Sequence, residues 1–301
     1  MKKSVESTEE GWKRRYIQHV SATTNRRRQS FSTVYLSLTI LALIIALVPL
    51  VLLLQTIISN GYHFLTWSFL TKVPAEPTIT HLDAVGGIVN GLVGTIVVVG
   101  LALTLSVPIG IGISVALCEL KGSVTETLRT SLAVLLGLPS VLFGIFVAAF
   151  LLRFHAPSSG VAGIVALSIL MVPVIAISGE EALRSVPKTY VEAALALGAA
   201  PSKVMSRVTM PMALPRIITG IFLALARASG ETAPILLVIG ISSTPQWNPF
   251  KQTTALPTLV WQLLQGVFPS QRQECWGVAI ILMAGVLTLN IIGRSFLAKS
   301  R

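Results

Sequence analysis

The sequence predicts an all-α membrane protein with six transmembrane helices, and three observations lead to this fold class. Hydrophobic residues make up 53% of the 301 residues and charged residues only 12%, with a mean hydropathy of +0.78. The apolar residues form runs of roughly 20, the length with which a helix crosses the hydrocarbon layer of a membrane. The runs lack the alternating pattern of a membrane β-barrel. This composition excludes a soluble enzyme, a secreted disulfide scaffold and a disordered protein.

The order of the elements follows from the charged residues, which mark the limits of the apolar runs. A basic tail covers residues 1–33, the first transmembrane helix covers 34–58, and an external loop covers 59–85. A larger domain then covers 86–293, and residues 294–301 form the C-terminal end. The sequence predicts five further spans, at about 91–117, 132–152, 161–177, 217–241 and 276–297.

The placement of lysine and arginine predicts the orientation of these spans, because cytoplasmic loops carry an excess of positive charge. If the N-terminus is cytoplasmic, eighteen of the 23 Lys and Arg residues lie on the cytoplasmic side. One more, Arg227, lies inside a span. Only four lie outside, namely Lys72, Arg153, Lys251 and Arg272. Both termini are therefore expected in the cytoplasm. The same rule explains the net charge of +11 without a nucleic acid partner.

A long cytoplasmic connection, residues 178–216, separates the fourth and fifth spans. Gly198 suits the C-terminus of a short helix, where a left-handed residue is favoured. Pro201 suits the first turn of a second short helix, which we expect Pro211 and Pro215 to end before the fifth span. The connection is thus predicted to be a helix–glycine–helix lever at the membrane surface. An amphipathic loop that lies on the lipid is the alternative.

The fifth span contains a charged pair. Arg227 lies about 15 Å along the helix from Ile217, near the centre of the bilayer, and Glu231 follows on the same helix face. Charges at this depth are functional candidates by default. A guanidinium group can grip a tetrahedral oxyanion with two parallel donors, Glu231 would neutralise it, and Ser229 and Thr232 add hydroxyl groups. The alternative is an ion pair that serves only helix packing.

Two motifs resemble known families, and the first lies in the long connection. Glu-Ala-Ala at 192–194, Gly198, and Val-Thr-Met-Pro at 208–211 resemble the EAA loop of type I ABC importer permeases, whose pattern ends in Ile-x-Leu-Pro. The resemblance implies a type I permease bundle whose loop is a coupling helix, docked in a groove of a cytoplasmic ATPase. The residues it assigns to coupling are Glu192, Ala193, Ala194, Gly198 and Pro211.

The second motif is the run 227–234, which reads Arg-Ala-Ser-Gly-Glu-Thr-Ala-Pro. It resembles the PstA-type permeases of bacterial phosphate ABC importers, as does the segment 86–91; sulfate and molybdate permeases tend to place Phe-Gly after the glutamate. The resemblance spans about 86–293 and implies phosphate import across the bacterial plasma membrane. The translocation path would then include Arg227, Ser229, Glu231 and Thr232. The implied partners are a PstC-like sister permease, a PstB-like ATPase dimer, a PstS-like phosphate-binding protein and membrane lipid.

No residues for catalysis, cofactors or metals are predicted. A P-loop needs Gly-Lys followed by Ser or Thr, and none of the Lys-Ser or Lys-Thr pairs, at Lys3, Lys188 and Lys299, follows a glycine. ATP hydrolysis is therefore expected on a separate subunit. Three other functions stay open: a type I permease for sulfate, molybdate or another small solute, an ATP-independent anion transporter or channel, and a scaffold that transports nothing.

Overall fold

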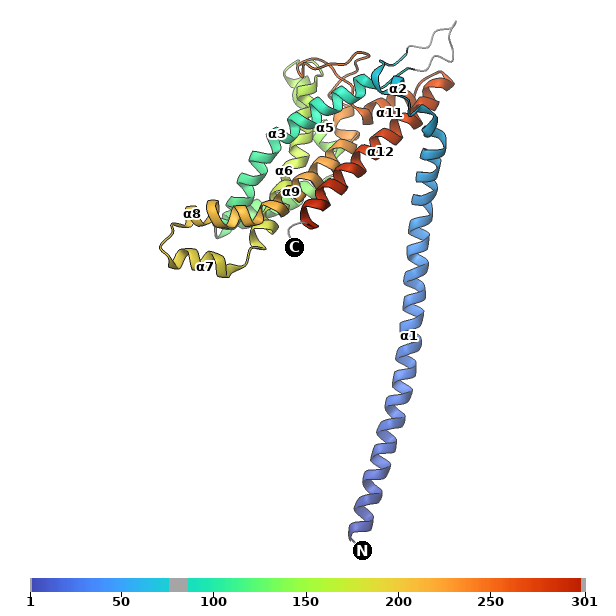
Figure 1. Ribbon diagram of the computed structural model, residues 1–301, viewed down its shortest axis with the longest axis vertical. Helices are drawn as coiled ribbons and strands as arrows, with labels where there is room; N and C mark the ends of the chain where they lie inside the picture. The colour runs from blue at the N-terminus through green and yellow to red at the C-terminus, as the bar shows by residue number, and fades with distance from the viewer. Residues whose placement is uncertain (1, 76–85, 299–301) are drawn as a thin grey trace. The chain divides into compact units, whose positions relative to one another are not determined.

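The computed structural model describes residues 2–75 and 86–298, and the regular secondary structure in these residues is helical (Figure 1). The chain divides into two compact units, Met1–Thr56 and Ile57–Arg301. Most of the first unit belongs to a single helix, α1 (Lys2–Gly61), which contains the predicted span 34–58. Large apolar side chains of α1 from Val34 onward are exposed, as expected of a helix that lies in lipid.

The second unit contains the remaining helices. Their bounds are α2 Trp67–Thr71, α3 Val89–Glu119, α4 Ser123–Gly137, α5 Val141–Arg153, α6 Gly160–Arg184, α7 Lys188–Ala196, α8 Pro201–Val204, α9 Met210–Gly230, α10 Ala233–Leu236, α11 Leu256–Leu264 and α12 Pro269–Ala298. Short 3₁₀ and π-helical stretches, η1 (Tyr62–Phe64) and η2 (Met205–Thr209), complete the described elements. Within the described residues, five helical segments are long and apolar enough to cross a membrane, or six if α4 and α5 form one span.

Helix α6 lies at the centre of this unit and packs against α3, α5 and α9, while α12 packs against α9 (Figure 1). Leu167, Met171 and Ile175 of α6 are buried in the main core, together with Ala102 of α3 and Ala224 of α9. Two-thirds of the most apolar window of α6 is buried, compared with about a quarter for α3. The continuous apolar run of α6 therefore reflects contact with protein on several sides rather than with lipid alone.

Small residues set the close approach of α3 and α6, as the sequence indicates. Ser106, Gly110 and Ser114 form a buried row on α3. A methyl group placed on Gly110 would lie 2.7 Å from Cγ2 of Ile175, which leaves no room for a side chain. Gly112, two residues later, does not pack in this way, because no atom outside its own stretch of helix lies within 4 Å of the place of such a methyl group.

The predicted span at 132–152 is wrong as a single helix. Helices α4 and α5 meet at an angle of 97° across a break that contains Pro139. Proline has no backbone N–H and disfavours helical geometry in the residue before it. Leu138 accordingly takes an extended conformation, with ψ of 140°. The pair is a broken span or a re-entrant segment rather than one straight crossing.

The boundary before the fifth span is also wrong. Pro211 and Pro215 do not end the second short helix, because α8 continues through η2 into α9 as one helical segment, Pro201–Gly230. Pro211 lies two residues after η2 within this segment, so its missing N–H removes one helical hydrogen bond without ending the helix. The π-helical stretch η2 directly before it accommodates the change in the hydrogen-bonding pattern.

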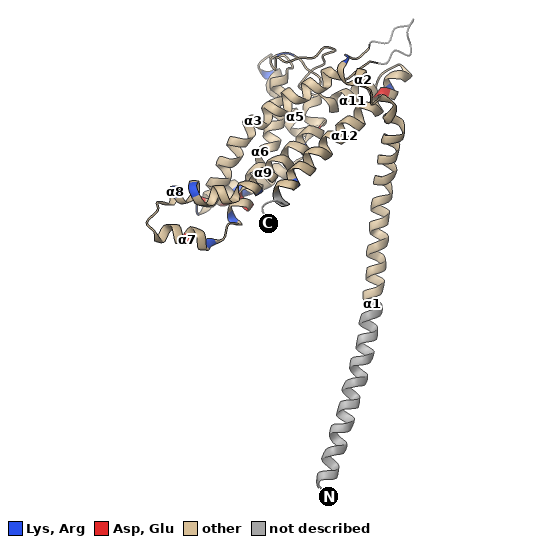
Figure 2. Cartoon of the chain, viewed as in Figure 1, with Lys and Arg blue, Asp and Glu red and all other residues tan. Residues whose placement is uncertain are grey.

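The charges of the second unit follow the predicted asymmetry (Figure 2). Many of its Lys and Arg residues lie around α7, α8 and the C-terminal end of α12, and the apolar helices between the two ends carry few charges. Other charges lie near the start of α6, at the opposite end: Arg153 is the last residue of α5, and the carbonyl of Lys251, between α10 and α11, accepts from the N–H of Gly160. The distribution is that of a bundle with one strongly basic face.

We predict that Gly110→Ala lowers the stability of the protein, whereas Gly112→Ala leaves it unchanged or slightly raised. The added methyl group at Gly110 collides with the buried side chain of Ile175, and overpacking of this kind costs about 1–3 kcal/mol. At Gly112 the methyl group meets open space and alanine favours the helix. Thermal unfolding of the two variants in one detergent tests this. Equal unfolding midpoints would contradict the packing described here.

Candidate functional site

The fifth predicted span is broken close to its middle, and this break organises the candidate site. Helix α9 ends at Gly230, Glu231 is extended with φ of −74° and ψ of 123°, and α10 begins at Ala233. Pro234 in the first turn of α10 cannot donate a backbone hydrogen bond. The predicted continuous helix 217–241 is therefore wrong. The break gives α9 a C-terminal end with unpaired carbonyl groups, which favours a positive charge nearby.

Arg227 lies in the last turn of α9, where that positive charge is favoured. Its Nε lies 3.4 Å from Oε1 of Glu231, so the predicted pair forms although Glu231 is beyond the helix end. The side chain of Arg227 is 44% exposed and that of Glu231 is 18% exposed. Within the described residues, the two NH₂ groups of Arg227 have no hydrogen-bond partner. This exposure argues against a pair that is buried for packing alone, and the NH₂ groups can bind an anion.

Arg227 belongs to a stripe on one face of α9. Arg216, Thr219, Leu223 and Arg227 follow one another at intervals of three or four residues, which places them on one side of a helix. Arg216, Leu223 and Arg227 are exposed and Thr219 is half-buried. The opposite side, with Ala224 and Ala228, lies in the core. The hydroxyl group of Thr219 donates to the carbonyl of Gly293 on α12, at 3.1 Å, while the other three side chains of the stripe remain exposed in the described part of this chain.

The other two residues predicted for the path lie differently. Ser229 is 8% exposed, and its hydroxyl group donates to the carbonyl of Leu225, 2.8 Å away, on the side of α9 that faces the core. Thr232 is half-buried in the connection to α10, and its carbonyl accepts from the N–H of Leu236 at 3.0 Å. The geometry thus brings together Arg227 and Glu231 but places Ser229 away from them.

The coupling residues lie on the predicted helix–glycine–helix lever. Helix α7 carries Glu192 and Ala193 exposed and Ala194 half-buried. Gly198 has φ of +83°, the left-handed conformation that ends a helix and that glycine adopts without strain. Leu197, directly before it, is 89% exposed. Pro211 is exposed at the start of α9.

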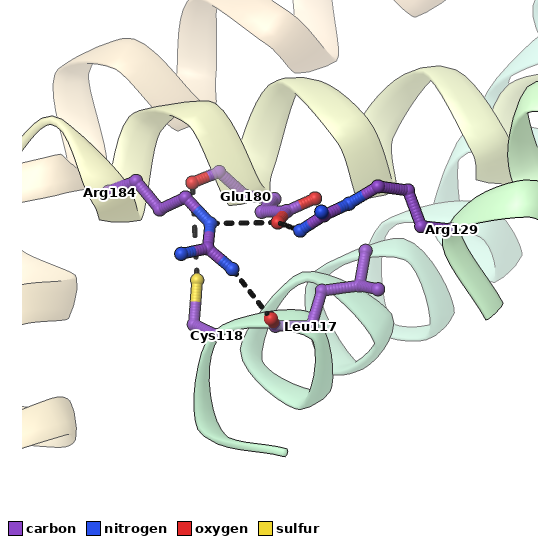
Figure 3. A network of polar contacts seen from close by, with 5 residues as sticks. All are labelled: Leu117, Cys118, Arg129, Glu180 and Arg184. Carbon is purple, nitrogen blue, oxygen red and sulfur yellow. Dashed lines mark hydrogen bonds and ion pairs between the residues drawn. The ribbon is translucent and has the colours of Figure 1, made fainter. Parts of the chain in front are cut away.

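A network around Glu180 escaped the sequence analysis (Figure 3). The carboxylate of Glu180, at the end of α6, is 7% exposed and accepts hydrogen bonds from Arg129 of α4 and from Nε of Arg184 at 2.8 Å. Arg184 also donates to the carbonyl of Leu117 at 3.0 Å, near the end of α3. The thiol of Cys118 lies 4.0 Å from the backbone carbonyl of Glu180. The network therefore joins the ends of α3 and α6 to the middle of α4.

One local signal could have revealed this network. Glu180 and Arg184 are four residues apart at the end of the apolar run 161–177, a spacing that pairs opposite charges on one helix face. The sequence analysis counted Arg129 and Arg184 only for orientation. For metals, no group of three His, Cys, Asp or Glu residues close enough to hold an ion occurs in the part of the chain that the structure describes.

Comparison with known proteins establishes the family. Residues 108–299 match the family described as "Binding-protein-dependent transport system inner membrane component". The matched segment is well over half of the chain. The chain belongs to this family. As a binding-protein-dependent permease it is a multi-pass membrane protein and a component of a transport system. The predicted resemblance to ABC importer permeases is confirmed.

The relatives of this permease carry a narrower name. "Phosphate transport system permease protein PstA 1" of Mycobacterium tuberculosis (strain ATCC 25618 / H37Rv) is 34% identical over 268 residues, which cover 88% of this chain and 87% of the relative. "Probable phosphate transport system permease protein PstA" of Methanocaldococcus jannaschii is 29% identical over 250 residues, which cover 82% of this chain and 87% of the relative. The predicted likeness to the PstA-type permeases is thus confirmed.

Solved structures agree on the fold of this permease. A crystal structure of an amino acid ABC transporter matches with a TM-score of 0.57 and 20% identity, over 70% of this chain and 93% of the other. An inward-facing structure of the MetNI methionine ABC transporter matches with a TM-score of 0.55 and 19% identity, over 71% of this chain and 94% of the other. The fold class predicted from the sequence, the type I ABC importer permease bundle, is confirmed.

The opposite orientation of neighbouring residues on α9 yields a test of the site. We predict that a cysteine at Arg227 reacts with a membrane-impermeant thiol reagent about tenfold or more faster than a cysteine at Ser229, because thiol reactivity requires access. The comparison uses the purified chain with Cys118 and Cys275 replaced by alanine. Equal reaction rates for Arg227→Cys and Ser229→Cys would show that the two faces of α9 are not as described.

Proposed function

We propose that this permease carries inorganic phosphate through the bacterial plasma membrane, as one half of a pore whose other half is a PstC-like sister permease. The observation that carries the proposal is Arg227, which is exposed at the break between α9 and α10 with its NH₂ groups unpaired in the described chain. The names of relatives up to 34% identical support phosphate as the solute. A type I permease for sulfate, molybdate or another small solute is the second candidate, because Arg227 offers the same donors to other oxyanions.

The pair of Arg227 and Glu231 is suited to bind a phosphate ion transiently rather than tightly. A guanidinium group can donate two parallel hydrogen bonds to a phosphate oxygen pair. Glu231, 3.4 Å away, balances the charge of Arg227 while the path is empty, and its negative charge weakens the hold on a divalent anion. A transporter needs this balance, because a site must release its solute as well as bind it. Ser229 and Thr232 remain proposed members of the path.

The orientation we propose places both termini and α7 in the cytoplasm. The basic end of the second unit, around α7 and α8, supports this, because cytoplasmic segments of membrane proteins are rich in Lys and Arg. The stripe from Arg216 to Arg227 then leads from the cytoplasmic end of α9 toward the middle of the membrane. The two arginines are eleven residues, or about 16 Å, apart along the helix.

The lever formed by α7 and Gly198 is proposed to dock in a groove of a PstB-like ATPase, two copies of which would bind the two permeases. Glu192, Ala193, Ala194 and Pro211 are the proposed coupling residues beside Gly198. Exposed Leu197 supports a protein partner rather than a loop that only lies on lipid, because it sits at a glycine turn and not on the apolar face of a long helix.

The unbroken helix from Pro201 to Gly230 supplies a mechanical link between lever and site. Its 30 residues extend about 45 Å. Closure of the ATPase dimer on ATP would move α7, and α8 would carry that motion along α9 to Arg227. The pore would open outward to accept phosphate from a PstS-like binding protein, and ATP hydrolysis would return it to the inward-open state. Catalysis of ATP hydrolysis is placed on the ATPase partner.

Uptake of radiolabelled phosphate tests the proposal directly. Proteoliposomes would contain the permease pair, the ATPase and the binding protein, with ATP enclosed on the ATPase side. We expect ATP-dependent phosphate uptake that Arg227→Gln reduces about ten- to 100-fold, the effect of losing a charge-assisted hydrogen bond. Arg294→Gln is the matched control, because Arg294 is an exposed arginine on α12 away from the break.

Each alternative predicts a different result in the same assay. A permease for another oxyanion would move sulfate or molybdate instead of phosphate. An anion transporter or channel that acts alone would show uptake without ATP. A scaffold would show no uptake with any solute. Phosphate uptake that survives Arg227→Gln would keep the solute but remove Arg227 from the path.

A further inference from the structure

Glu180 joins the end of α6 to α3 and α4 at the place where the coupling lever begins. We propose that Glu180 is a positioning residue, which transmits the motion of the lever α7 to α3 and α4 through Arg184 and Arg129. The inference rests on the proposed coupling to an ATPase. It adds a second route for that motion, next to the direct one along α8 and α9.

The first step of the route is the short link between α6 and α7. Arg184 is the last residue of α6, and α7 begins only four residues later, at Lys188. The N–H of Ser185 donates to the carbonyls of Glu181 and Ala182, at 3.0 and 3.3 Å. Val186 is 9% exposed and packs in one cluster with Ala182 and Leu183 of α6 and with Ala213 and Ile217 of α9. A link this short and packed moves together with the end of α6.

The second step passes through the carboxylate of Glu180. Oε1 of Glu180 accepts hydrogen bonds from both Arg129 and Arg184, so one buried oxygen holds two arginines from two helices (Figure 3). A carboxylate that is 7% exposed requires such partners, because an unpaired buried charge is very unfavourable. The contact between Arg129 and this carboxylate therefore ties the position of α4 to the position of α6.

The third step reaches α3. Arg184 donates to the carbonyl of Leu117, 3.0 Å away. This carbonyl lies in the last turn of α3, where the helix itself supplies no N–H donor for it. Helix α3 contacts α6 along its length, and α4 leads into the 97° bend before α5. A displacement of the end of α6 thus acts on α3 and on the broken α4–α5 pair at the same time.

The arginines have the exposure expected of a contact that can change during transport. The side chains of Arg129 and Arg184 are 52% and 53% exposed, in contrast to the buried carboxylate between them. Arg129 reaches Glu180 through one nitrogen, so it can exchange this contact for water while α4 stays folded.

The test measures coupling, not only activity. In proteoliposomes with the complete transporter, phosphate uptake and ATP hydrolysis are recorded together for the original chain and for Glu180→Gln. We expect the number of phosphate ions taken up per ATP to fall about tenfold, within the range by which single residues modulate coupling between sites. Glu181→Gln is the matched control, because Glu181 is the next residue but is exposed, with no side-chain partner in the described chain. It should leave the ratio unchanged.

Two further variants decide the remaining cases. If Glu180→Gln fails to assemble, Arg129→Gln serves, because it leaves the pair of Glu180 and Arg184 intact; it should also lower the ratio. Where Glu180→Gln assembles, it is also combined with Arg129→Gln. The ratio of the double variant should be no lower than that of the more affected single variant, since both changes act on the same contact between Arg129 and Glu180. A ratio that stays constant in these variants would overturn the proposal, even if both rates fall.

The same assay separates this inference from the proposed function. If the original transporter moves sulfate or molybdate instead of phosphate, the solute assignment fails, and the ratio is measured with the ion that moves. If it moves none of the three with ATP, both proposals fall. If it moves phosphate and the ratio does not respond to Glu180→Gln or Arg129→Gln, only the role of Glu180 falls.

Discussion

The requirement that backbone polar groups find partners inside a membrane governs this structure. Lipid offers no hydrogen bonds, so a helix can break at membrane depth only where it lines protein or water. Helix α9 breaks at Gly230, close to the middle of its apolar run, and Arg227 stands in the last turn before the break. Both the open carbonyls and the guanidinium group are polar features that lipid would exclude. The simplest setting for them is a hydrated path along the exposed stripe of α9.

This constraint also explains how the rest of the bundle is arranged. Helix α6 supplies the core against which α3, α5 and α9 pack, so the polar stripe can remain open on the other side of α9. The helical segment Pro201–Gly230 connects the lever to the break without interruption. At the other side of the lever, the Glu180 network fixes the end of α6 to its neighbours. The lever is thus attached to the bundle at both of its ends.

The sequence predicted the features that depend on local chemistry. The apolar runs gave the fold class, Gly198 gave the turn of the lever, and the spacing of Arg227 and Glu231 gave their pairing. It failed where the outcome depends on tertiary contacts. The span predicted at 132–152 is divided by a 97° break at Pro139, whereas Pro211, which was predicted to end a helix, lies within a continuous one. The partner of Glu180 on α4 lies 51 residues away, and no local pattern identifies it.

The central claim is that Arg227 faces the path of the anion in the assembled transporter. Electron cryo-microscopy of the complete complex with phosphate, stopped in an intermediate state by an ATPase variant that binds but does not hydrolyse ATP, tests this most directly. The account predicts an anion about 3 Å from the NH₂ groups of Arg227, in a cavity between this chain and its sister permease. Arg227 sealed in a dry contact with the sister permease, with the anion on another route, would contradict it.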